Sequence, residues 1–349
     1  LQSNYYKMAH IPFILRSMDT LYKAYETAGH VVSPKPNSIS FRVLTEAVSG
    51  GNFYEEQLPL NSNENKIISN APTVDLNIGE DIKIICTNCV NVISKDILKF
   101  ERILELPSEN IDMSEWFCPC SHGHSSHNHG LTMKSHKCDF LYRLTYFVVQ
   151  CSILSERTNK FNSKRNIYHC NRCLAWLGLK TDDKIKLFNS TVKVSRENNN
   201  DSYIFKYKAT SLSDISLNDF IFTIEKMSKE FNIGFQYAIM CKLVLECNFS
   251  DSKKQYLLIW IMDKELQVLH NVEDTTDIKL KSNLLAKILY KIDDGGSEVE
   301  QWLSDPTIIS SEISKSMFLK GVEHLKKMSL KIPESFRSTN GYSVSYLNV

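Results

Sequence analysis

The chain has 349 residues, 42% of them hydrophobic, and a formal net charge of +1 at neutral pH. Its length allows a substantial core and predicts one to three domains. The scattered, nearly balanced charge argues against direct binding of nucleic acid, and the longest apolar run around Trp260, residues 256–262, is too short to cross a membrane.

The start of the chain carries no secretory signal pattern, and its first methionine is Met8. We expect Met8 to be the native start, with residues 1–7 a remnant of recombinant expression. Ten cysteines would permit disulfides, but without a secretory signal they favour metal ligands in a reducing compartment. We therefore expect a cytoplasmic and nuclear protein.

Residues 8–195 are predicted to form a β-rich region of short antiparallel strands. Alternating or apolar runs indicate strands at 38–44, 81–85, 142–149 and 192–194. Residues 196–202 lack an apolar run and contain three consecutive asparagines, which makes them the best linker candidate.

Residues 203–349 are predicted to form an α+β region with two amphipathic helices, so the whole chain is expected to be α+β and rich in strands. Ser216 and Asp219 resemble a capping box that opens the first helix. Strands follow at 237–245, 256–262 and 266–269, with Asp263-Lys264 as a hairpin turn between the last two. The second helix spans about 313–328, and Asn340-Gly341 precedes a final strand at 342–347. The helices present these apolar residues on one face: Phe220, Ile224, Met227 and Phe231, and Ile313, Met317, Val322, Leu325 and Met328.

Two Cys-x-x-Cys pairs, Cys86/Cys89 and Cys170/Cys173, are the strongest chemical signal. Each pair can present two thiolates on one side of a tight turn, and four thiolates form the tetrahedral sulfur site that zinc prefers. The 80 residues between the pairs exceed the usual span of a zinc ribbon. We therefore predict one structural zinc ion that holds both ends of a long excursion, residues 90–169. Cys151, Cys241 and Cys247 lie in apolar runs and are predicted to be core residues.

Five motifs in a fixed order resemble the HECT-like ubiquitin-conjugating-enzyme-binding family, whose animal members are ubiquitin-protein ligases. The resemblance covers about residue 80 to the end of the chain. The motifs are Cys86/Cys89, Leu106 to Asn110, Glu115 to Cys118, Cys170/Cys173 with Leu177-Gly178, and Asn340…Val344…Leu347.

This resemblance implies two functions. One is ubiquitin ligation together with a ubiquitin-conjugating enzyme. The other is binding to the metallo-β-lactamase-fold endonuclease that cleaves pre-mRNA 3′ ends, the nuclease subunit of the cleavage and polyadenylation specificity factor. In the second case residues 106–118 would lie exposed in the free protein and enter the nuclease active site, and Cys118 would bind its zinc. The docking residues implied by the resemblance are Leu106, Pro107, Ser108, Glu109 and Trp116.

The sequence departs from the family pattern just after Cys118. Cys120 follows at once, so either thiol can be the one that reaches the partner's metal. A tract of four histidines within eight residues comes next, and it predicts either a solvated loop or a weak zinc-collecting site. Its members are His122, His124, His127 and His129.

A ubiquitin thioester would require an accessible cysteine with a lowered pKa. Cys247 is the last cysteine, so the C-terminal cysteine of true HECT ligases is missing, and no interleaved RING pattern is present. Cys118 and Cys120 would be the nucleophiles if a thioester formed. We therefore expect primarily an inhibitor and chaperone of the nuclease. The alternatives are a ubiquitin ligase that acts with a conjugating enzyme, and a histidine-rich zinc donor to the nuclease.

Overall fold

The computed structural model describes residues 71–106, 139–155, 166–197, 201–207, 214–231, 240–271 and 280–348. The strand predicted at 38–44 lies outside these ranges. The chain divides into two compact units, Leu1–Ile67 with Glu265–Leu285, and Ile68–Lys264 with Ala286–Val349. Apart from the adjoining ends of two long strands, the elements below belong to the second unit.

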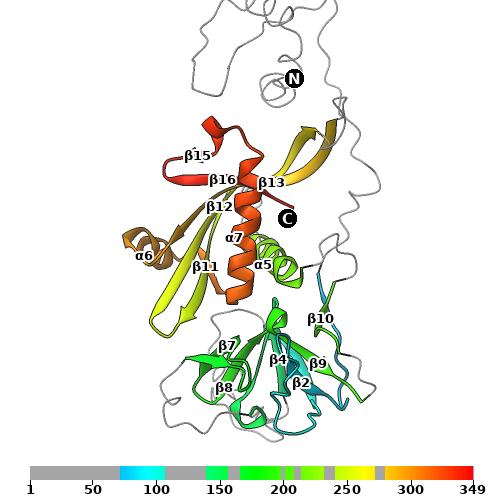
Figure 1. Cartoon of the computed structure of the whole chain (residues 1–349). Helices are drawn as coiled ribbons and strands as arrows, with labels where there is room; N and C mark the ends of the chain where they lie inside the picture. The colour runs from blue at the N-terminus through cyan, green and yellow to red at the C-terminus, as the bar shows by residue number, and fades with distance from the viewer. Residues whose placement is uncertain are drawn as a thin grey trace, which may run out of the picture. The chain divides into compact units, whose positions relative to one another are not determined.

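A six-stranded sheet organises the part of the chain around the cysteine pairs (Figure 1). Its neighbouring strands are antiparallel except for the first two, which run parallel. In spatial order the strands are β3 (Arg102–Glu105), β4 (Asp139–Arg143), β5 (Tyr146–Gln150), β8 (Lys184–Phe188), β7 (Trp176–Thr181) and β6 (Ile167–His169).

Two short strand pairs accompany this sheet. They are β2 (Lys83–Cys86) with β9 (Val192–Ser195), and β1 (Thr73–Val74) with β10 (Phe205–Lys206). Phe140 and Phe147 from the sheet share one buried cluster with Ile84 of β2 and Val194 of β9. The 3-10 turns η1 (Cys151–Ile153) and η2 (Asn189–Thr191) connect these elements. The predicted strands at 81–85, 142–149 and 192–194 are confirmed, although a turn divides the second into two strands.

A second six-stranded sheet forms the C-terminal part (Figure 1). The spatial order is β14 (Ile309–Glu312), β11 (Cys241–Ser250), β12 (Lys253–Asn271), β13 (Leu280–Asp293), β16 (Tyr342–Leu347) and β15 (Ser338–Thr339). β14 runs parallel to β11, whereas β11 with β12, β13 with β16 and β15 with β16 are antiparallel pairs.

Three helices cover the two faces of this sheet. On one face α5 (Ile215–Phe231) and α7 (Lys315–Leu330) pack against Leu243 and Ile259. On the other face α6 (Ser297–Ser304) contributes Trp302 to a cluster with Val244. Because successive side chains of a strand point to opposite faces, β11 supplies both cores. A 3-10 turn, η4 (Glu334–Phe336), follows α7.

Both predicted helices are confirmed, and their apolar faces are buried at Phe220, Ile224 and Met227 and at Met317 and Leu325. The capping box is wrong. The side chain of Asp214 accepts the Ser216 N–H at 2.9 Å, whereas Asp219 points into the interior, fully buried.

The predicted hairpin turn at Asp263-Lys264 is also wrong, because β12 continues through both residues. Lys264 Nζ donates to the Ser228 carbonyl of α5 at 2.9 Å, so packing on the helix keeps this polar pair extended. The hairpin turn lies at the other end of the strand, at residues 251–252. By contrast, Asn340-Gly341 does form the expected turn, with φ values of 49° and 80°.

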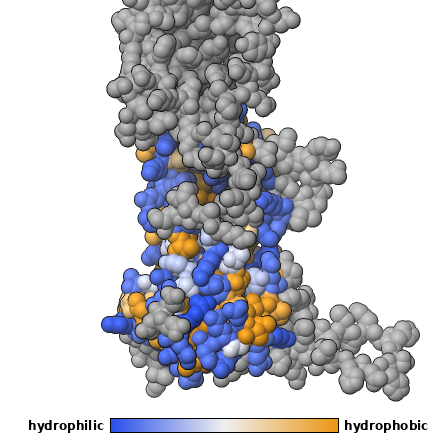
Figure 2. Space-filling model, turned by 90° about the vertical axis from the view of Figure 1, so that its right-hand side faces the viewer, coloured by the Kyte–Doolittle hydropathy of each residue, from blue (hydrophilic) through white to orange (hydrophobic). Residues whose placement is uncertain are grey.

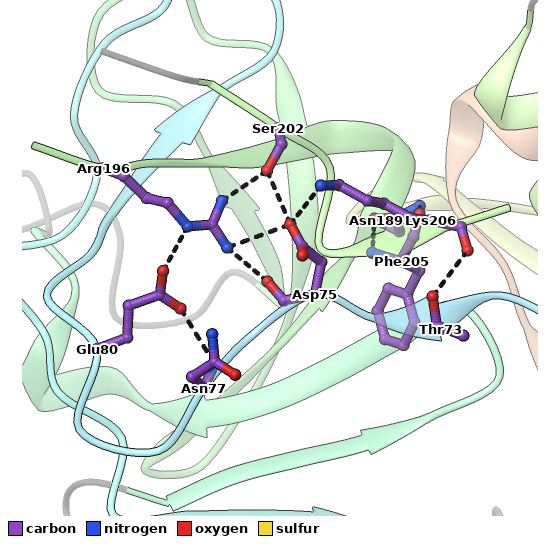
Figure 3. A network of polar contacts seen from close by, with 9 residues as sticks. All are labelled: Thr73, Asp75, Asn77, Glu80, Asn189, Arg196, Ser202, Phe205 and Lys206. Carbon is purple, nitrogen blue, oxygen red and sulfur yellow. Dashed lines mark hydrogen bonds and ion pairs between the residues drawn. The ribbon is translucent and has the colours of Figure 1, made fainter. Parts of the chain in front are cut away.

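Arg196 and Ser202, the ends of the linker candidate, take part in a polar network (Figure 3). Arg196 Nε lies 2.6 Å from Glu80, and its Nη1 donates to Ser202 Oγ at 2.7 Å. Arg196 Nη2 donates to the Asp75 carbonyl at 2.6 Å, and Lys206 Nζ lies 2.7 Å from the Asp75 carboxylate. The hydrogen bond from Arg196 lowers the pKa of Glu80. The network ties the described ends of 196–202 to the chain near β1, and the domain boundary there stays a prediction.

Candidate metal centre

Two loops with the same backbone geometry carry the four paired cysteines. The first loop is residues 86–91 and the second is residues 170–175. The Cys86 carbonyl accepts from the N–H of residue 90 at 2.9 Å, and its own N–H donates to the carbonyl of residue 91 at 2.9 Å. In the second loop the Cys170 carbonyl accepts from residue 174 at 3.1 Å, and its N–H donates to residue 175 at 2.9 Å.

The loops also share an unusual conformation directly after their second cysteine. Val90 has φ of 58° and Leu174 has φ of 59°, in the left-handed region that few residues other than glycine adopt. This conformation reverses the chain directly after each Cys-x-x-Cys pair. Local backbone hydrogen bonds therefore hold each pair with both sulfurs on the same side.

The two loops bring their sulfurs together from distant parts of the chain. Cys86 Sγ lies 3.8 Å from Cys173 Sγ, and Cys89 Sγ lies 3.6 Å from Cys170 Sγ. All four sulfurs lie within 4.8 Å of one another. A tetrahedral site with metal–sulfur bonds of about 2.3 Å requires sulfurs about 3.8 Å apart, which matches these two distances. The thiols are free, and their separations are far beyond a disulfide bond of about 2.05 Å.

The surroundings shift the pKa values of three of these thiols, and not all in the same direction. Burial raises the pKa of Cys86 to about 12, and desolvation also raises that of Cys89. A hydrogen bond from the Asn88 side chain is the main cause that lowers the pKa of Cys173 to about 6. A bound cation would convert all four to thiolates, because metal ligation requires the deprotonated form. The donor set and its spacing thus fit a metal ion, as the paired motif predicted.

Of the predicted docking residues, the structure describes Leu106. Its side chain is 5% exposed, so the expected exposure is wrong at this position. Its N–H donates to the Tyr142 carbonyl at 2.8 Å, and its carbonyl accepts from Arg143 Nη1 at 3.1 Å. Arg143 in turn pairs with Glu230 of α5 at 2.6 Å. Leu106 is therefore a fixed point from which the chain continues towards the predicted docking segment.

The remaining predicted site residues lie outside the described ranges, and their roles stay predictions. They are Pro107, Ser108, Glu109, Trp116, Cys118, Cys120, His122, His124, His127 and His129.

The cysteines predicted to be core residues divide into two groups. Cys241 and Cys247 are buried as expected, at 1% and 0% exposure, and burial raises their pKa values to about 11 and about 12. Cys151 is only partly buried but packs against one of the buried clusters, so its assignment to the core is confirmed in part. A buried thiol with a raised pKa stays protonated at neutral pH, which makes Cys241 and Cys247 poor nucleophiles.

A buried polar group around Asp219 was missed by the sequence analysis. The Asp219 carboxylate accepts from Tyr207 Oη at 2.6 Å and from Asn189 Nδ2 at 3.3 Å. Burial raises its pKa to about 7, against the opposing effect of these hydrogen bonds. Asp219 lies on α5 and Asn189 in η2, directly before β9, so the group joins the helix to the region of the metal centre. The sequence assigned Asp219 to a helix cap, and no local pattern indicated its burial.

Among the comparisons with known proteins, the one with protein families found a match. The family described as HECT-like ubiquitin-conjugating enzyme (E2)-binding matches residues 17–344. Neither the curated proteins nor the solved structures contained a match to this chain. Within the described residues, no helix combines the length and the apolar character needed to traverse a bilayer. Because the match spans most of its length, the chain belongs to the HECT-like ubiquitin-conjugating enzyme (E2)-binding family.

Proposed function

We propose that the chain is a zinc-stabilised binding protein, and the closed four-cysteine cluster is the observation that carries this proposal. Four thiolates fill a tetrahedral coordination sphere, so no position is left for water or substrate. Zinc is the metal that such an all-sulfur tetrahedral set favours among the common divalent ions. The centre would contribute folding free energy and hold its two loops rigid, and chemistry would have to take place elsewhere.

The binding function we favour is inhibition and chaperoning of the metallo-β-lactamase-fold endonuclease of pre-mRNA 3′-end processing. Its support is the sequence resemblance of residues 106–118 together with the fixed position of Leu106. Because Leu106 is buried and held by Tyr142 and Arg143, the segment that docks would begin at Pro107. Cys118 would bind the nuclease zinc and displace the water that a metallohydrolase activates.

The test compares Cys118→Ala with the wild-type chain, using the purified nuclease. We expect Cys118→Ala to lose inhibition of RNA cleavage by at least about tenfold while the dissociation constant changes less, because the other docking contacts remain. Cys120→Ala is the matched control and should still inhibit. Full inhibition by Cys118→Ala together with loss of inhibition by Cys120→Ala would transfer the role to Cys120, and full inhibition by both would refute the mechanism.

A second candidate function is supported by the family itself, whose description names binding of a ubiquitin-conjugating enzyme. In this case the chain would act as a scaffold that holds the conjugating enzyme through non-covalent contacts. Cys241 and Cys247 are buried, and the four paired cysteines would be committed to the metal, so six of the seven described thiols are unsuited to carry ubiquitin. The histidine-rich tract as a zinc donor remains the third alternative.

A thioester assay separates the scaffold from a ligase with its own nucleophile. The chain would be incubated with ubiquitin, activating enzyme and conjugating enzyme, and resolved without reductant. We expect no thiol-sensitive ubiquitin adduct on the wild-type chain. An adduct that disappears in the double variant Cys118→Ser with Cys120→Ser would establish covalent transfer, and one that disappears in Cys151→Ser would place it on that partly exposed thiol.

A further inference from the structure

Two large apolar side chains stand exposed on the metal-binding loops. Val90 is 60% exposed and Leu174 is 61% exposed. Each directly follows a metal-ligating cysteine, Cys89 or Cys173, whose sulfurs belong to the same cluster. The two residues therefore directly follow ligands of one candidate metal centre, although 83 residues separate them in the sequence.

The backbone conformation makes these residue types unexpected. Glycine or asparagine occupies the left-handed region with little strain, whereas a β-branched residue such as valine is a rare outlier there. Among the described residues, three other non-glycine residues have positive φ. Asp182 and Asn340 are ordinary turn formers, and Leu144 is buried at 7% exposure. Val90 and Leu174 alone in the described ranges combine positive φ, an apolar side chain and exposure.

Neither side chain is explained by the fold. Both lie outside the three buried clusters and outside the partly buried residues packed against them. The loops need a reversal of the chain at these positions, and any residue that accepts positive φ would supply it. Val90 and Leu174 therefore combine a strained backbone with an exposed apolar side chain, and neither feature improves the packing of the fold. This combination is typical of contact sites.

We infer that Val90 and Leu174 form the contact surface for the ubiquitin-conjugating enzyme, an inference that rests on the second candidate function proposed above. Figure 2 shows apolar patches among hydrophilic residues on one face of the molecule. Exposure of an apolar side chain is therefore not enough by itself to identify a contact surface. The metal centre is what distinguishes this pair, because ligation fixes both loops and removes the cost of ordering them on binding.

The size of the surface favours a transient globular partner over a second copy of the chain. A stable interface buries about 800 Å² on each partner, far more than two projecting side chains offer. Transient signalling contacts use smaller areas, with a few apolar anchors that carry most of the energy. A conjugating enzyme that exchanges between free and ubiquitin-charged forms requires a contact of this reversible kind.

The double variant Val90→Asn with Leu174→Asn tests this surface. Asparagine suits positive φ, so the variant should keep its metal content and its melting temperature. We expect its affinity for a purified conjugating enzyme, measured by calorimetry with the full chain, to fall at least about tenfold. Ile97→Asn is the control, because Ile97 is also an exposed apolar residue (53%). Its neighbour Leu98 pairs with Ile82, which precedes β2, whereas Cys86 ends that strand.

The three outcomes are distinct. Loss of affinity in the double variant but not in Ile97→Asn supports the surface. Equal affinity of the double variant and the wild-type chain overturns the surface and leaves the scaffold function standing. If the wild-type chain binds no member of a panel of purified conjugating enzymes, free or linked to ubiquitin through a stable ester, both the scaffold function and the surface are refuted.

Discussion

Arg102 forms a two-point ion pair with Asp139, with Nε to Oδ1 at 2.7 Å and Nη2 to Oδ2 at 2.6 Å. These residues open β3 and β4 and face each other in the parallel register. The Asp139 side chain is only 3% exposed, so the carboxylate end of this ion pair is shielded from solvent. The chain between β3 and β4 carries the proposed docking segment, and the ion pair fixes the point at which that chain returns to the sheet.

Arg102→Ala should destabilise the protein by about 3–5 kcal/mol, because it removes the two-point contact to a buried carboxylate. The stability of Arg102→Lys should lie between that of Arg102→Ala and that of the wild type, since an ammonium group cannot form the two-point contact. Urea unfolding followed by circular dichroism provides the measurement. Lys320→Ala removes an exposed pair with Glu323 and should change the stability little. An Arg102→Ala variant as stable as Lys320→Ala would contradict the assigned role.

Gly178 belongs to one of the motifs on which the sequence resemblance rests, and its small size has a steric explanation. A Cβ atom at this position would lie 2.1 Å from the Lys186 carbonyl oxygen of the neighbouring strand β8. The Lys186 oxygen is a backbone atom and cannot move aside as a flexible side chain would, so β7 and β8 would have to separate. Gly178→Ala should destabilise the fold by more than about 3 kcal/mol, whereas Thr181→Ala at the exposed end of β7 should cost less than about 1 kcal/mol. Similar unfolding midpoints for the two variants would show that the strands can adjust.

Asp219 should make the stability depend on pH. Its pKa is raised in the folded protein to about 7, chiefly by burial, from an ordinary value of 3.8. Between pH 4 and pH 7 the folded state therefore holds more protons at this site than the unfolded state. Its contribution to stability is greatest at low pH and is lost as the pH rises through 7. Asp219→Asn should flatten the fall in unfolding free energy between pH 4 and pH 7, measured by urea titration. An unchanged slope would show that Asp219 does not govern it.

Metal removal should unfold the region around the cysteine loops. We expect one zinc ion per chain by elemental analysis and a large drop in melting temperature on chelation. Cys170→Ser should abolish metal binding and cost more than about 4 kcal/mol, because three thiols would remain around an incomplete site. Cys151→Ser, which changes a cysteine outside the cluster, should retain both metal and stability. A metal-free wild-type protein with an unchanged melting temperature would exclude a structural zinc.

The sequence predicted the features that depend on short-range patterns. The apolar spacing of residues 220–227 identified α5, and paired Cys-x-x-Cys spacing identified the cluster, because both signals are contained within a few residues. The continuous strand through Asp263-Lys264 was missed because a contact with α5, distant in sequence, overrides the turn tendency of the two residues.

The anchoring of the docking segment could not be predicted for a similar reason. The sequence suggested that the cysteine pairs hold the excursion 90–169, but the structure holds its inner part at Arg102–Asp139 and at Leu106. These contacts depend on the parallel pairing of β3 with β4, and no short sequence pattern predicts that pairing. Arg102 is one of the scattered basic residues of the sequence, yet its side chain is only 24% exposed and is paired with Asp139.

The two cysteine loops leave different sheets: the first follows β2, which pairs with β9, and the second connects β6 to β7. A metal ion shared by these loops would bind only when the sheets are packed together. Metal affinity and the integrity of the core between the sheets are then thermodynamically linked. Substitutions that leave cavities in this core, such as Ile84→Ala or Leu177→Ala, should weaken metal retention without changing a ligand. The rate of zinc release to a chelator would therefore report on the packing of the core.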